Sequence, residues 1–229
     1  MTVIFGGRGF IGSHLARALP EANVFQGRMD NLDEMRAAVR GARTIYHLAG
    51  KNRVKAEGDI IKNNVLATSN IVRACKIESA GQRVKVVFLS STQVKTRPIS
   101  DYGFAKAIEE KILMDNFETA IIRAPGIFGP GCRPFYNSVV ATFCHQVARG
   151  NSPTIHGGGD EKIELMYIDH IIYHLLNPIY NTTHTYGKHS GGFESSIAGL
   201  ARVILSKPTM GNIGETLEWH RRQYEISGT

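Results

Sequence analysis

Short apolar runs alternate with longer amphipathic stretches over the first half of the chain. Runs such as TVIF (2–5) and VKVVFLSS (84–91) are continuous, which is typical of strands buried on both faces of a sheet. The stretches between them repeat apolar residues three and four apart, the period of an α-helix. The predicted strands cover 2–5, 22–25, 43–50, 84–91 and 119–125, and the predicted helices cover 10–19, 31–41, 60–81 and 102–116. This alternation predicts an α/β fold with a Rossmann-type, doubly wound parallel sheet.

The pattern changes beyond about residue 126, where glycine and proline clusters interrupt it in GIFGPGCRP (126–134) and HGGGD (156–160). The predicted elements there are a helix near 137–149, a strand and helix within 163–176, a strand at 184–189, and helices at 194–205 and 214–224. We expect residues 1–126 to form a dinucleotide-binding core. Residues 127–229 should form a small substrate-binding cap, interleaved with the last elements of the core.

Composition narrows the classes of partner. Lysine and arginine number 27 against 20 acidic residues, a net charge of +7. The basic residues are scattered without interleaved aromatics, so a solvated surface or a phosphate-bearing small molecule explains the charge better than a nucleic acid. Three cysteines without CxxC spacing indicate a reducing compartment, and no apolar run approaches the roughly 18 residues of a spanning helix. We expect a cytoplasmic protein with no metal and no nucleic acid or membrane partner.

A glycine-rich segment, GGRGFIG (6–12), lies directly after the first predicted strand and before the first predicted helix. In a first βα turn, glycines at Gly6, Gly9 and Gly12 permit a tight turn, close approach of a pyrophosphate, and packing of helix on strand. The helix N-terminus also favours an anion. The segment therefore predicts a dinucleotide site, with Phe10 and Ile11 at its helical end.

Two arginines decide the expected cofactor. Arg8 lies inside the glycine-rich segment, and FQGRMD (25–30) offers no acidic residue at the end of the second predicted strand to bind a ribose 2′-hydroxyl. Because Arg8 and Arg28 would accommodate a 2′-phosphate, we predict NADP(H) as the preferred cofactor and NAD(H) as the second choice. Asp30 is expected to meet the adenine amino group.

A serine, a tyrosine and a lysine suggest the chemistry. SSTQV (90–94) ends the fourth predicted strand, and YGFAK (102–106) places Tyr102 and Lys106 four residues apart on one helix face. An ammonium one turn away stabilises a phenolate, which lets the phenol exchange a proton near neutral pH. A serine hydroxyl at the neighbouring strand end would hydrogen-bond a carbonyl oxygen. A Tyr-x-x-x-Lys pair alone is common on helices, but with the glycine-rich segment it indicates an oxidoreductase.

These segments together resemble the extended branch of the short-chain dehydrogenase/reductase superfamily, the NAD-dependent epimerase/dehydratase family, whose members modify nucleotide sugars. The resemblance covers the first 130 residues and is carried by GGRGFIG (6–12), Asp30, HLAG (47–50), NNV (63–65), SST (90–92), YGFAK (102–106) and RAPGIFGP (123–130). It implies that Tyr102 is the general acid and that Lys106 also binds the nicotinamide ribose. Ser91 would hold the substrate oxygen, with Ser90 or Thr92 as alternatives.

The same resemblance implies a lining for the cofactor cleft, formed by Leu48, Ala49, Gly50 and Asn64. His47 and Asn64 fit an ordinary structural role equally well. A narrower resemblance lies in 129–150, which is similar to the reductase domain of capsular-polysaccharide enzymes that reduce UDP-2-acetamido-2,6-dideoxy-hexuloses at C4 with NADPH. In those enzymes a cupin domain with epimerase activity follows. We expect this chain to lack it, so that another protein would supply any epimerisation.

The substrate contacts and the oligomer are further expectations from the resemblance. IELMY (163–167) lacks the arginine that usually grips the diphosphate, so Arg133 would take over, with Thr92, Asn137 and Ser138 as further contacts. Alternatively, FYNSVVATF (135–143) is simply the core face of a helix. The helices at 60–79 and 102–116 would form the four-helix interface of a homodimer.

The resulting prediction is an NADPH-dependent reductase of a nucleotide-activated 4-keto-deoxy sugar in surface polysaccharide biosynthesis. Two alternatives stay open. One is an NAD-dependent epimerase or dehydratase that retains its cofactor through the cycle. The other is a non-catalytic, NADP(H)-binding regulatory protein whose cap has degenerated.

Overall fold

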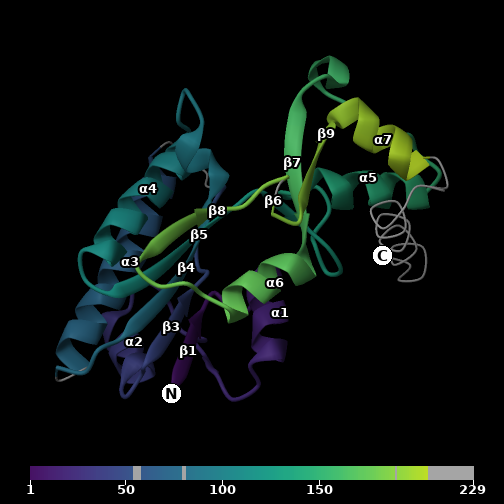
Figure 1. Cartoon of the computed structure of the whole chain (residues 1–229). Coiled ribbons are helices and arrows are strands. Elements are labelled where there is room, and N and C mark those ends of the chain that lie inside the picture. Colours follow the sequence, from purple (N-terminus) through teal and green to yellow (C-terminus); the bar gives the residue numbers. More distant parts are fainter. Residues whose placement is uncertain (54–57, 79–80, 189, 206–229) are drawn as a thin grey trace. The chain divides into compact units, whose positions relative to one another are not determined.

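The computed structural model describes residues 1–53, 58–78, 81–188 and 190–205. The chain divides into two compact units, whose elements are labelled in Figure 1. The first unit contains residues 1–124 and 172–186, and the second contains residues 125–171 and the chain from 187 onward. The helix predicted at 214–224 lies outside the described residues.

A parallel six-stranded sheet forms the centre of the first unit, in the order β2-β1-β3-β4-β5-β8. Its strands are β1 (Thr2–Phe5), β2 (Asn23–Val24), β3 (Thr44–His47), β4 (Lys85–Ser91), β5 (Glu118–Ala124) and β8 (Thr182–Thr185). The order reverses at β1, so the connections after β1 and β3 leave on opposite faces. Sheets of this kind bind ligands in the crevice at such a reversal. The predicted doubly wound parallel sheet is confirmed.

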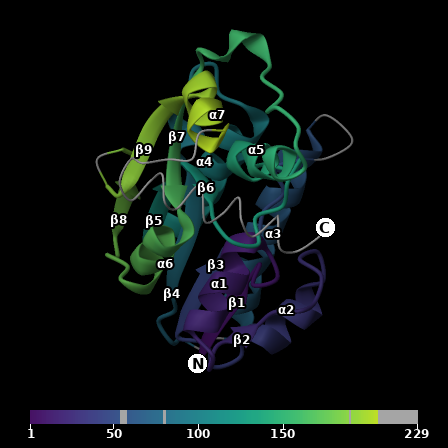
Figure 2. The same cartoon turned by 90° about the vertical axis from the view of Figure 1, so that its right-hand side faces the viewer.

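Helices cover both faces of this sheet (Figures 1 and 2). On one face lie α2 (Leu32–Val39), α3 (Asp59–Glu78) and α4 (Asp101–Met114), and α1 (Phe10–Ala18) lies on the other. A short 3-10 turn, η1 (Thr92–Lys95), connects β4 toward α4. The Ser100 hydroxyl accepts a hydrogen bond from the Gly103 N–H at 3.1 Å and thereby caps α4. This cap fixes where the helix begins, one residue before Tyr102.

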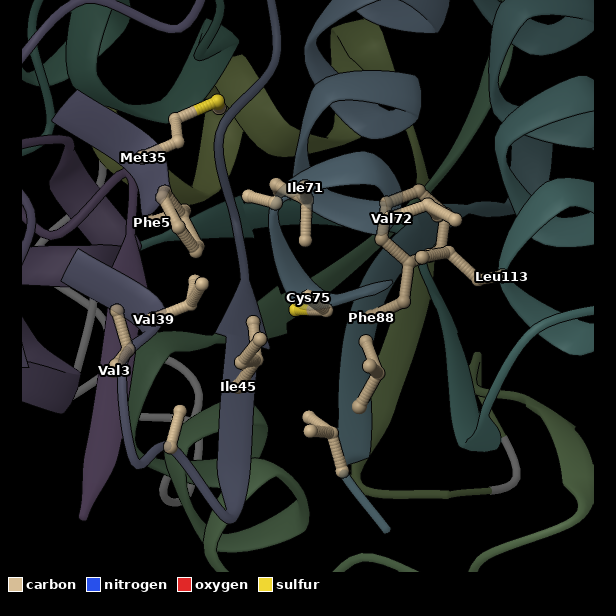
Figure 3. Close-up of a cluster of buried hydrophobic side chains, with 14 of the residues drawn as sticks. Val3, Phe5, Met35, Val39, Ile45, Ile71, Val72, Cys75, Phe88 and Leu113 are labelled. Atoms are coloured by element: carbon tan, nitrogen blue, oxygen red, sulfur yellow. The ribbon is translucent and has the colours of Figure 1, made fainter. Parts of the chain in front are cut away.

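The core of the first unit explains why its strands are continuous apolar runs. Val3, Phe5 and Phe88 point from one face of the sheet into a cluster with side chains of α2, α3 and α4 (Figure 3). The alternate residues Ile4 and Val87 are also fully buried, on the opposite face. Each large side chain removed from water in this way stabilises the fold by about 1.5–3 kcal/mol. A strand buried on both faces therefore has no polar positions in its middle.

The second unit has its own sheet, in the order β6-β7-β9. Its strands are β6 (Gly126–Phe128), β7 (Lys162–Tyr167) and β9 (Gly192–Ser196), and its helical elements are α5 (Val139–Ala148), η2 (Gly157–Gly159) and α7 (Ile197–Leu205). β7 pairs in parallel with β6 and antiparallel with β9. A separate core packs Phe128, Phe143 and Leu200 together. Helix α6 (Ile168–Leu176) leads the chain from this unit back into the first.

Three predicted elements differ from the structure. The strand predicted at 184–189 is β8, which begins at Thr182 and stops at Thr185 before the turn at Gly187. The helix predicted at 194–205 begins only at Ile197, because residues 194–196 pair with β7 as part of β9 and the Ser196 hydroxyl accepts from the Gly199 N–H. Residues 126–128, predicted as part of a loop, form β6.

Candidate functional site

The glycine-rich segment forms a tight turn at the sheet reversal. Gly6 follows β1 with a φ of +86°, which side chains other than glycine rarely adopt. A Cβ on Gly6 would lie 2.5 Å from the Ala49 backbone nitrogen, beyond the end of β3. The two segments that bound the crevice therefore touch backbone to backbone, and only glycine fits at position 6.

The third glycine lets α1 begin against the turn. A Cβ on Gly12 would lie 2.1 Å from the Gly6 carbonyl oxygen, a distance that no side chain tolerates. Gly9 is the N-cap residue of α1 and provides no capping side chain, and Phe10 and Ile11 form the first turn. The first N–H groups of a helix lack partners within the helix and attract anions. This cradle of bare backbone fits the pyrophosphate of a dinucleotide.

A pocket of about 300 Å³ lies in the first unit and is lined by five of the predicted cofactor residues. It is lined by Arg28, Met29, Asp30, Ala49, Gly50, Lys51, Asn63, Asn64, Leu66 and Ala67. The predicted residue Leu48 is tied to β1 by its backbone N–H, which donates to the Phe5 carbonyl at 2.9 Å. The structure thus brings Arg28, Asp30, Ala49, Gly50 and Asn64 together in one hollow.

Charges at one side of this pocket are paired. Arg28 donates from Nε and Nη2 to both carboxylate oxygens of Asp30, at 2.9 and 2.7 Å. The hydrogen bond from Arg28 lowers the pKa of Asp30, and the same contact raises the pKa of Arg28. Both side chains are exposed, so an anionic ligand could compete for the guanidinium. Arg8 is exposed on the glycine-rich turn.

Asn64 has a structural task as well as a place in the pocket. Its side-chain oxygen accepts from the Lys51 N–H at 2.7 Å, and its amide nitrogen donates to the Lys51 carbonyl at 2.8 Å. This pair of bonds clamps the loop after β3 to α3. The sequence leaves open whether Asn64 contacts the cofactor or has a structural role. These two hydrogen bonds show the structural role directly.

Lys106 reaches the wall of the same pocket from α4. A Cβ added to Gly50 would lie only 3.3 Å from the Lys106 ammonium. The ammonium lies 4.4 Å from the ring centre of Phe88. Its Nζ is 5.8 Å from the ring centre of Tyr102, one helical turn earlier. Tyr102 is half-buried, whereas the Lys106 side chain is almost wholly enclosed. The predicted Tyr-x-x-x-Lys pair therefore shares one face of α4, and Lys106 adjoins the pocket.

The three hydroxyls at the end of β4 differ in what they bind. Ser90 donates to the Glu110 carboxylate, which also binds Arg123 through two hydrogen bonds. The Ser91 hydroxyl accepts from the Gln93 N–H at 3.2 Å and keeps its own hydrogen for a further acceptor. Thr92 is half-buried at the start of η1. Ser90 thus belongs to a buried structural network, and Ser91 and Thr92 are the better candidates for contact with a ligand.

The model of the NAD dependent epimerase/dehydratase family matches residues 2–176 of this chain, well over half of it. The chain belongs to this family. The family consists of oxidoreductase-type enzymes that use NAD or NADP, in agreement with the glycine-rich cradle and the adjoining pocket.

One relative within the family is the UDP-2-acetamido-2,6-beta-L-arabino-hexul-4-ose reductase of Pseudomonas aeruginosa. It is 30% identical over 179 residues, which cover 74% of this chain and 47% of that protein. The chain spans about half the length of the curated relatives that it matches first.

Two solved structures have a similar fold. The capsular polysaccharide assembling protein CapF from Staphylococcus aureus aligns with a TM-score of 0.79 and 23% identity, covering 99% of this chain and 66% of that one. UDP-glucose 4-epimerase from Thermotoga maritima aligns with a TM-score of 0.83 and 18% identity, covering 100% and 99%. At these identities the two structures support the epimerase/dehydratase fold alone.

The residues predicted to contact substrate fall into both units. Ser91 and Thr92 belong to the first unit, and Arg133, Asn137 and Ser138 belong to the second. Ser138 caps α5, because its hydroxyl accepts from the Ala141 N–H at 3.2 Å. Arg133 and Asn137 are exposed, and the Arg133 guanidinium lies 5.6 Å from the ring centre of Tyr136. The alternative for 135–143 was the core face of a helix. It applies only to the part within α5, which begins at Val139 and buries Val140, Ala141 and Phe143.

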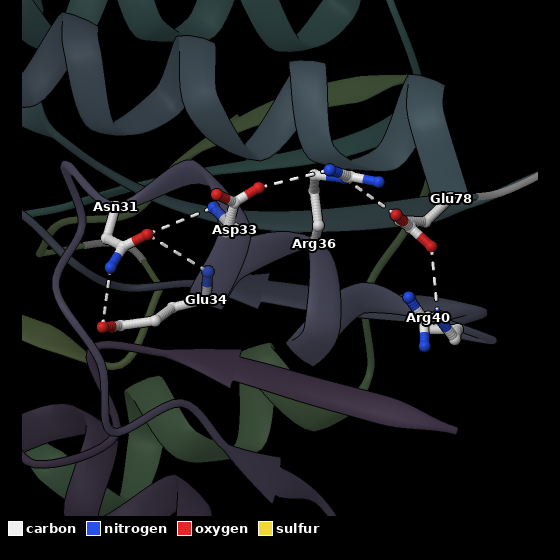
Figure 4. A network of polar contacts seen from close by, with 6 residues as sticks. All are labelled: Asn31, Asp33, Glu34, Arg36, Arg40 and Glu78. Atoms are coloured by element: carbon white, nitrogen blue, oxygen red, sulfur yellow. Dashed lines mark hydrogen bonds and ion pairs between the residues drawn. The ribbon is translucent and has the colours of Figure 1, made fainter.

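Sequence reasoning missed two carboxylates. Glu34 folds back so that its side chain accepts from the Arg28 N–H at 2.8 Å. The same side chain accepts from the Asn31 amide at 2.7 Å (Figure 4). The signal was available, because Asn31 and Glu34 have the spacing of a capping box. Glu109 is completely buried beside Lys106, at 3.3 Å. Its signal is the spacing of seven residues from Tyr102, which returns to the same helix face.

The sequence analysis expects neither a metal site nor a membrane partner. In the part of the chain that the structure describes, no group of three or more histidine, cysteine or acidic side chains could hold a metal ion. No helix in that part has both the length and the apolar character to cross a membrane.

Burial raises the pKa of the Cys75 thiol to about 12, which leaves it unreactive at neutral pH.

Proposed function

We propose that this chain is an NADP(H)-dependent reductase that acts on the keto group of a nucleotide-activated sugar, with Tyr102 as the proton donor. The observation that carries the proposal is the position of the Lys106 ammonium. It lies against Gly50, a residue of the pocket that also contains Asn64 and Arg28, and its helix carries Tyr102 one turn earlier. Cofactor pocket and candidate acid are thereby linked by one side chain.

In this proposal, each predicted site residue of the first unit discussed below has a defined task. The backbone of the glycine-rich turn binds the cofactor pyrophosphate, and NADPH supplies the hydride when bound. Lys106 holds a ribose hydroxyl and stabilises the phenolate of Tyr102 after that residue has given up its proton. Ser91 or Thr92 donates a hydrogen bond to the substrate oxygen on which negative charge develops.

The preference for NADP(H) is supported by two exposed cations near the expected ribose, Arg8 and Arg28. The Asp30 carboxylate already binds Arg28, and Glu34 lies at the backbone of the same loop. We therefore assign the 2′-phosphate chiefly to Arg8, with Arg28 joining once it leaves Asp30. Tighter binding of NADPH than of NADH in a fluorescence titration would support this assignment, and equal affinity would refute it.

The substrate that we propose is a UDP-linked 4-keto-deoxy sugar, used in the synthesis of a surface polysaccharide. It is supported by the hexulose reductase named above, which shares 30% identity with this chain. Arg133 and Asn137 of the second unit are the candidates to bind the nucleotide diphosphate, since a guanidinium matches its oxygens.

A homodimer is also part of the proposal. Exposed apolar side chains occur on the two helices expected to form its interface, with Ile77 on α3 and Phe104 and Met114 on α4. Apolar side chains gathered on a helical surface are typical of an interface between subunits. A molecular mass near twice that of the chain, measured by light scattering, would support the dimer.

The decisive experiment compares the wild-type protein with Tyr102→Phe. Incubated with NADPH and a UDP-4-keto-6-deoxy-N-acetylhexosamine, the wild type should consume NADPH stoichiometrically. The variant should lose turnover by about two to four orders of magnitude, the usual contribution of a general acid, and bind NADPH within twofold of the wild type. Undiminished turnover in the variant would remove Tyr102 from the mechanism.

The same assay separates the two alternatives. An epimerase or dehydratase that retains its cofactor would convert the sugar without net loss of NADPH. A regulatory protein would bind NADPH tightly and convert none of a panel of nucleotide keto-sugars.

A further inference from the structure

The network behind Lys106 consists of polar groups that are wholly enclosed. The Lys106 side chain is only 3% exposed, and the Glu109 side chain beside it is 0% exposed. An isolated ammonium in such a place would be strongly disfavoured, because it has lost its water. Glu109 Oε2 lies 3.3 Å from Lys106 Nζ and provides the opposite charge.

Glu109 is ionised despite its burial. Burial alone would raise the pKa of its carboxyl, but the Lys106 ammonium, followed by His47 and Thr68, lowers that pKa to about 2. Glu109 is therefore a carboxylate at neutral pH and provides the negative charge of the ion pair. Both of its members are on α4, three residues apart, so no change of fold is needed to form it.

A second layer holds the carboxylate itself. The Thr68 hydroxyl of α3 donates to Glu109 Oε1 at 2.8 Å, and Nε2 of His47 lies 2.8 Å from the same hydroxyl. Because a hydroxyl has one hydrogen and Thr68 gives it to Glu109, His47 must donate from Nε2. Burial lowers the pKa of His47, so the ring is neutral and carries its proton there.

The front of the network faces the cofactor pocket. The Lys106 ammonium lies against Gly50 of the pocket wall and over the ring of Phe88. A lysine side chain has a long flexible stem, so the position of its ammonium depends on the groups that hold it. Among the described contacts, the carboxylate of Glu109 is the one that holds the ammonium in place by charge.

We propose that Glu109 is a positioning residue, whose carboxylate, held by Thr68 and His47, fixes the Lys106 ammonium at the wall of the cofactor pocket. The inference rests on the proposed function only in its catalytic consequence. Its consequence for cofactor binding is independent of which substrate is reduced.

The test uses four variants of the whole chain. Glu109→Gln removes the charge and keeps the shape, Glu109→Asp keeps the charge on a shorter stem, and Thr68→Val removes only the second layer. Glu78→Gln is the matched control, since that carboxylate also binds two basic side chains, Arg36 and Arg40, but at the protein surface (Figure 4). Circular dichroism and melting curves establish that each variant is folded.

NADPH binding is measured first, by nicotinamide fluorescence. Glu109→Gln should weaken it about tenfold and Thr68→Val about threefold, because a misplaced ammonium no longer meets the ribose. Glu109→Asp should recover most of the loss, and Glu78→Gln should bind within twofold of the wild type. Turnover should follow, with kcat reduced about tenfold or more in Glu109→Gln and KM for the keto-sugar changed less than threefold.

Wild-type NADPH affinity in a folded Glu109→Gln variant would overturn the inference. If that variant does not fold, wild-type affinity in a folded Thr68→Val variant would overturn it equally. Failure of the proposed function gives a different result: the wild type reduces no keto-sugar, while the variants still lose NADPH affinity in the order given.

Discussion

Two carboxylates bind basic side chains in the first unit, and they differ in their surroundings. Glu109 is buried with one lysine, one threonine and one histidine, beside the cofactor pocket. Glu78 binds Arg36 and Arg40 at the outer end of α2 and α3, where both arginines reach solvent (Figure 4). Water and salt compensate for a broken pair at the surface, whereas nothing compensates inside. The buried pair should therefore affect stability and function together, and the surface pair should affect stability slightly.

The largest loss of unfolding free energy is expected from Lys106→Met, which breaks the buried pair. The substitution leaves Glu109 as an unpaired buried charge, which typically costs about 3–5 kcal/mol of unfolding free energy. Urea unfolding at pH 7 measures the loss. The double variant Lys106→Met/Glu109→Gln should recover most of it, because neither partner then carries a charge. If the double variant is as unstable as the single one, packing and not charge determines the cost.

The pH dependence of stability should separate the two carboxylates next. The folded-state pKa of Glu109 is about 2, below its ordinary value of 4.5, so the unfolded chain takes up this proton first as the pH falls. The contribution is complete above about pH 4.5 and is lost progressively toward pH 2. Burial also lowers the pKa of His47, which adds a loss that begins below about pH 6.5.

Urea midpoints at pH 7, 5 and 3.5 test this expectation. Wild-type protein should lose stability steeply below pH 4.5, and Glu109→Gln should lack most of that step. Glu78→Gln should keep most of it, because the two arginines that bind Glu78 reach solvent, where water and salt weaken the pair. Parallel curves for the wild type and Glu109→Gln would contradict an ionised Glu109.

A smaller effect is expected from Asn31→Ala in the surface network. The Asn31 side chain caps α2 by accepting from the N–H groups of Asp33 and Glu34. Loss of such a cap costs about 1 kcal/mol. The melting temperature should fall by a few degrees while NADPH affinity stays within twofold. A large loss of affinity would mean that the loop carrying Arg28 depends on this cap.

The sequence predicted most of the first unit because its signals are local. Continuous apolar runs marked the strands. Gly6 and Gly12 were recognised from their spacing, and the structure gives the reason: at each position a Cβ would collide with neighbouring backbone. The short strands β6 and β9 were missed, because both are held by pairing with β7, far away in the sequence. Pairing of that kind leaves little trace in local composition.

The candidate site was predicted unevenly for a related reason. Tyr102 and Lys106 follow a spacing rule, and the pocket residues Ala49, Gly50 and Asn64 follow from the family resemblance. Glu109 shows only its spacing of seven residues from Tyr102, which a solvated glutamate on the same helix would also show. Its burial depends on Thr68 and His47, which come from two other elements. The choice of Ser91 or Thr92 over Ser90 likewise needed the structure, which places Ser90 against Glu110.

The edge strand β8 gives the first unit a consequence for synthesis. It pairs with β5, yet it is made only after residues 125–171 of the second unit. On the ribosome, the sheet must wait with the β5 edge uncovered until about 60 further residues have emerged, several seconds at ordinary elongation rates. A nascent chain halted near Ala124 would expose the unpaired edge of β5 to other polypeptides. Chaperones that cover such an edge are therefore expected to engage this protein between the synthesis of β5 and that of β8.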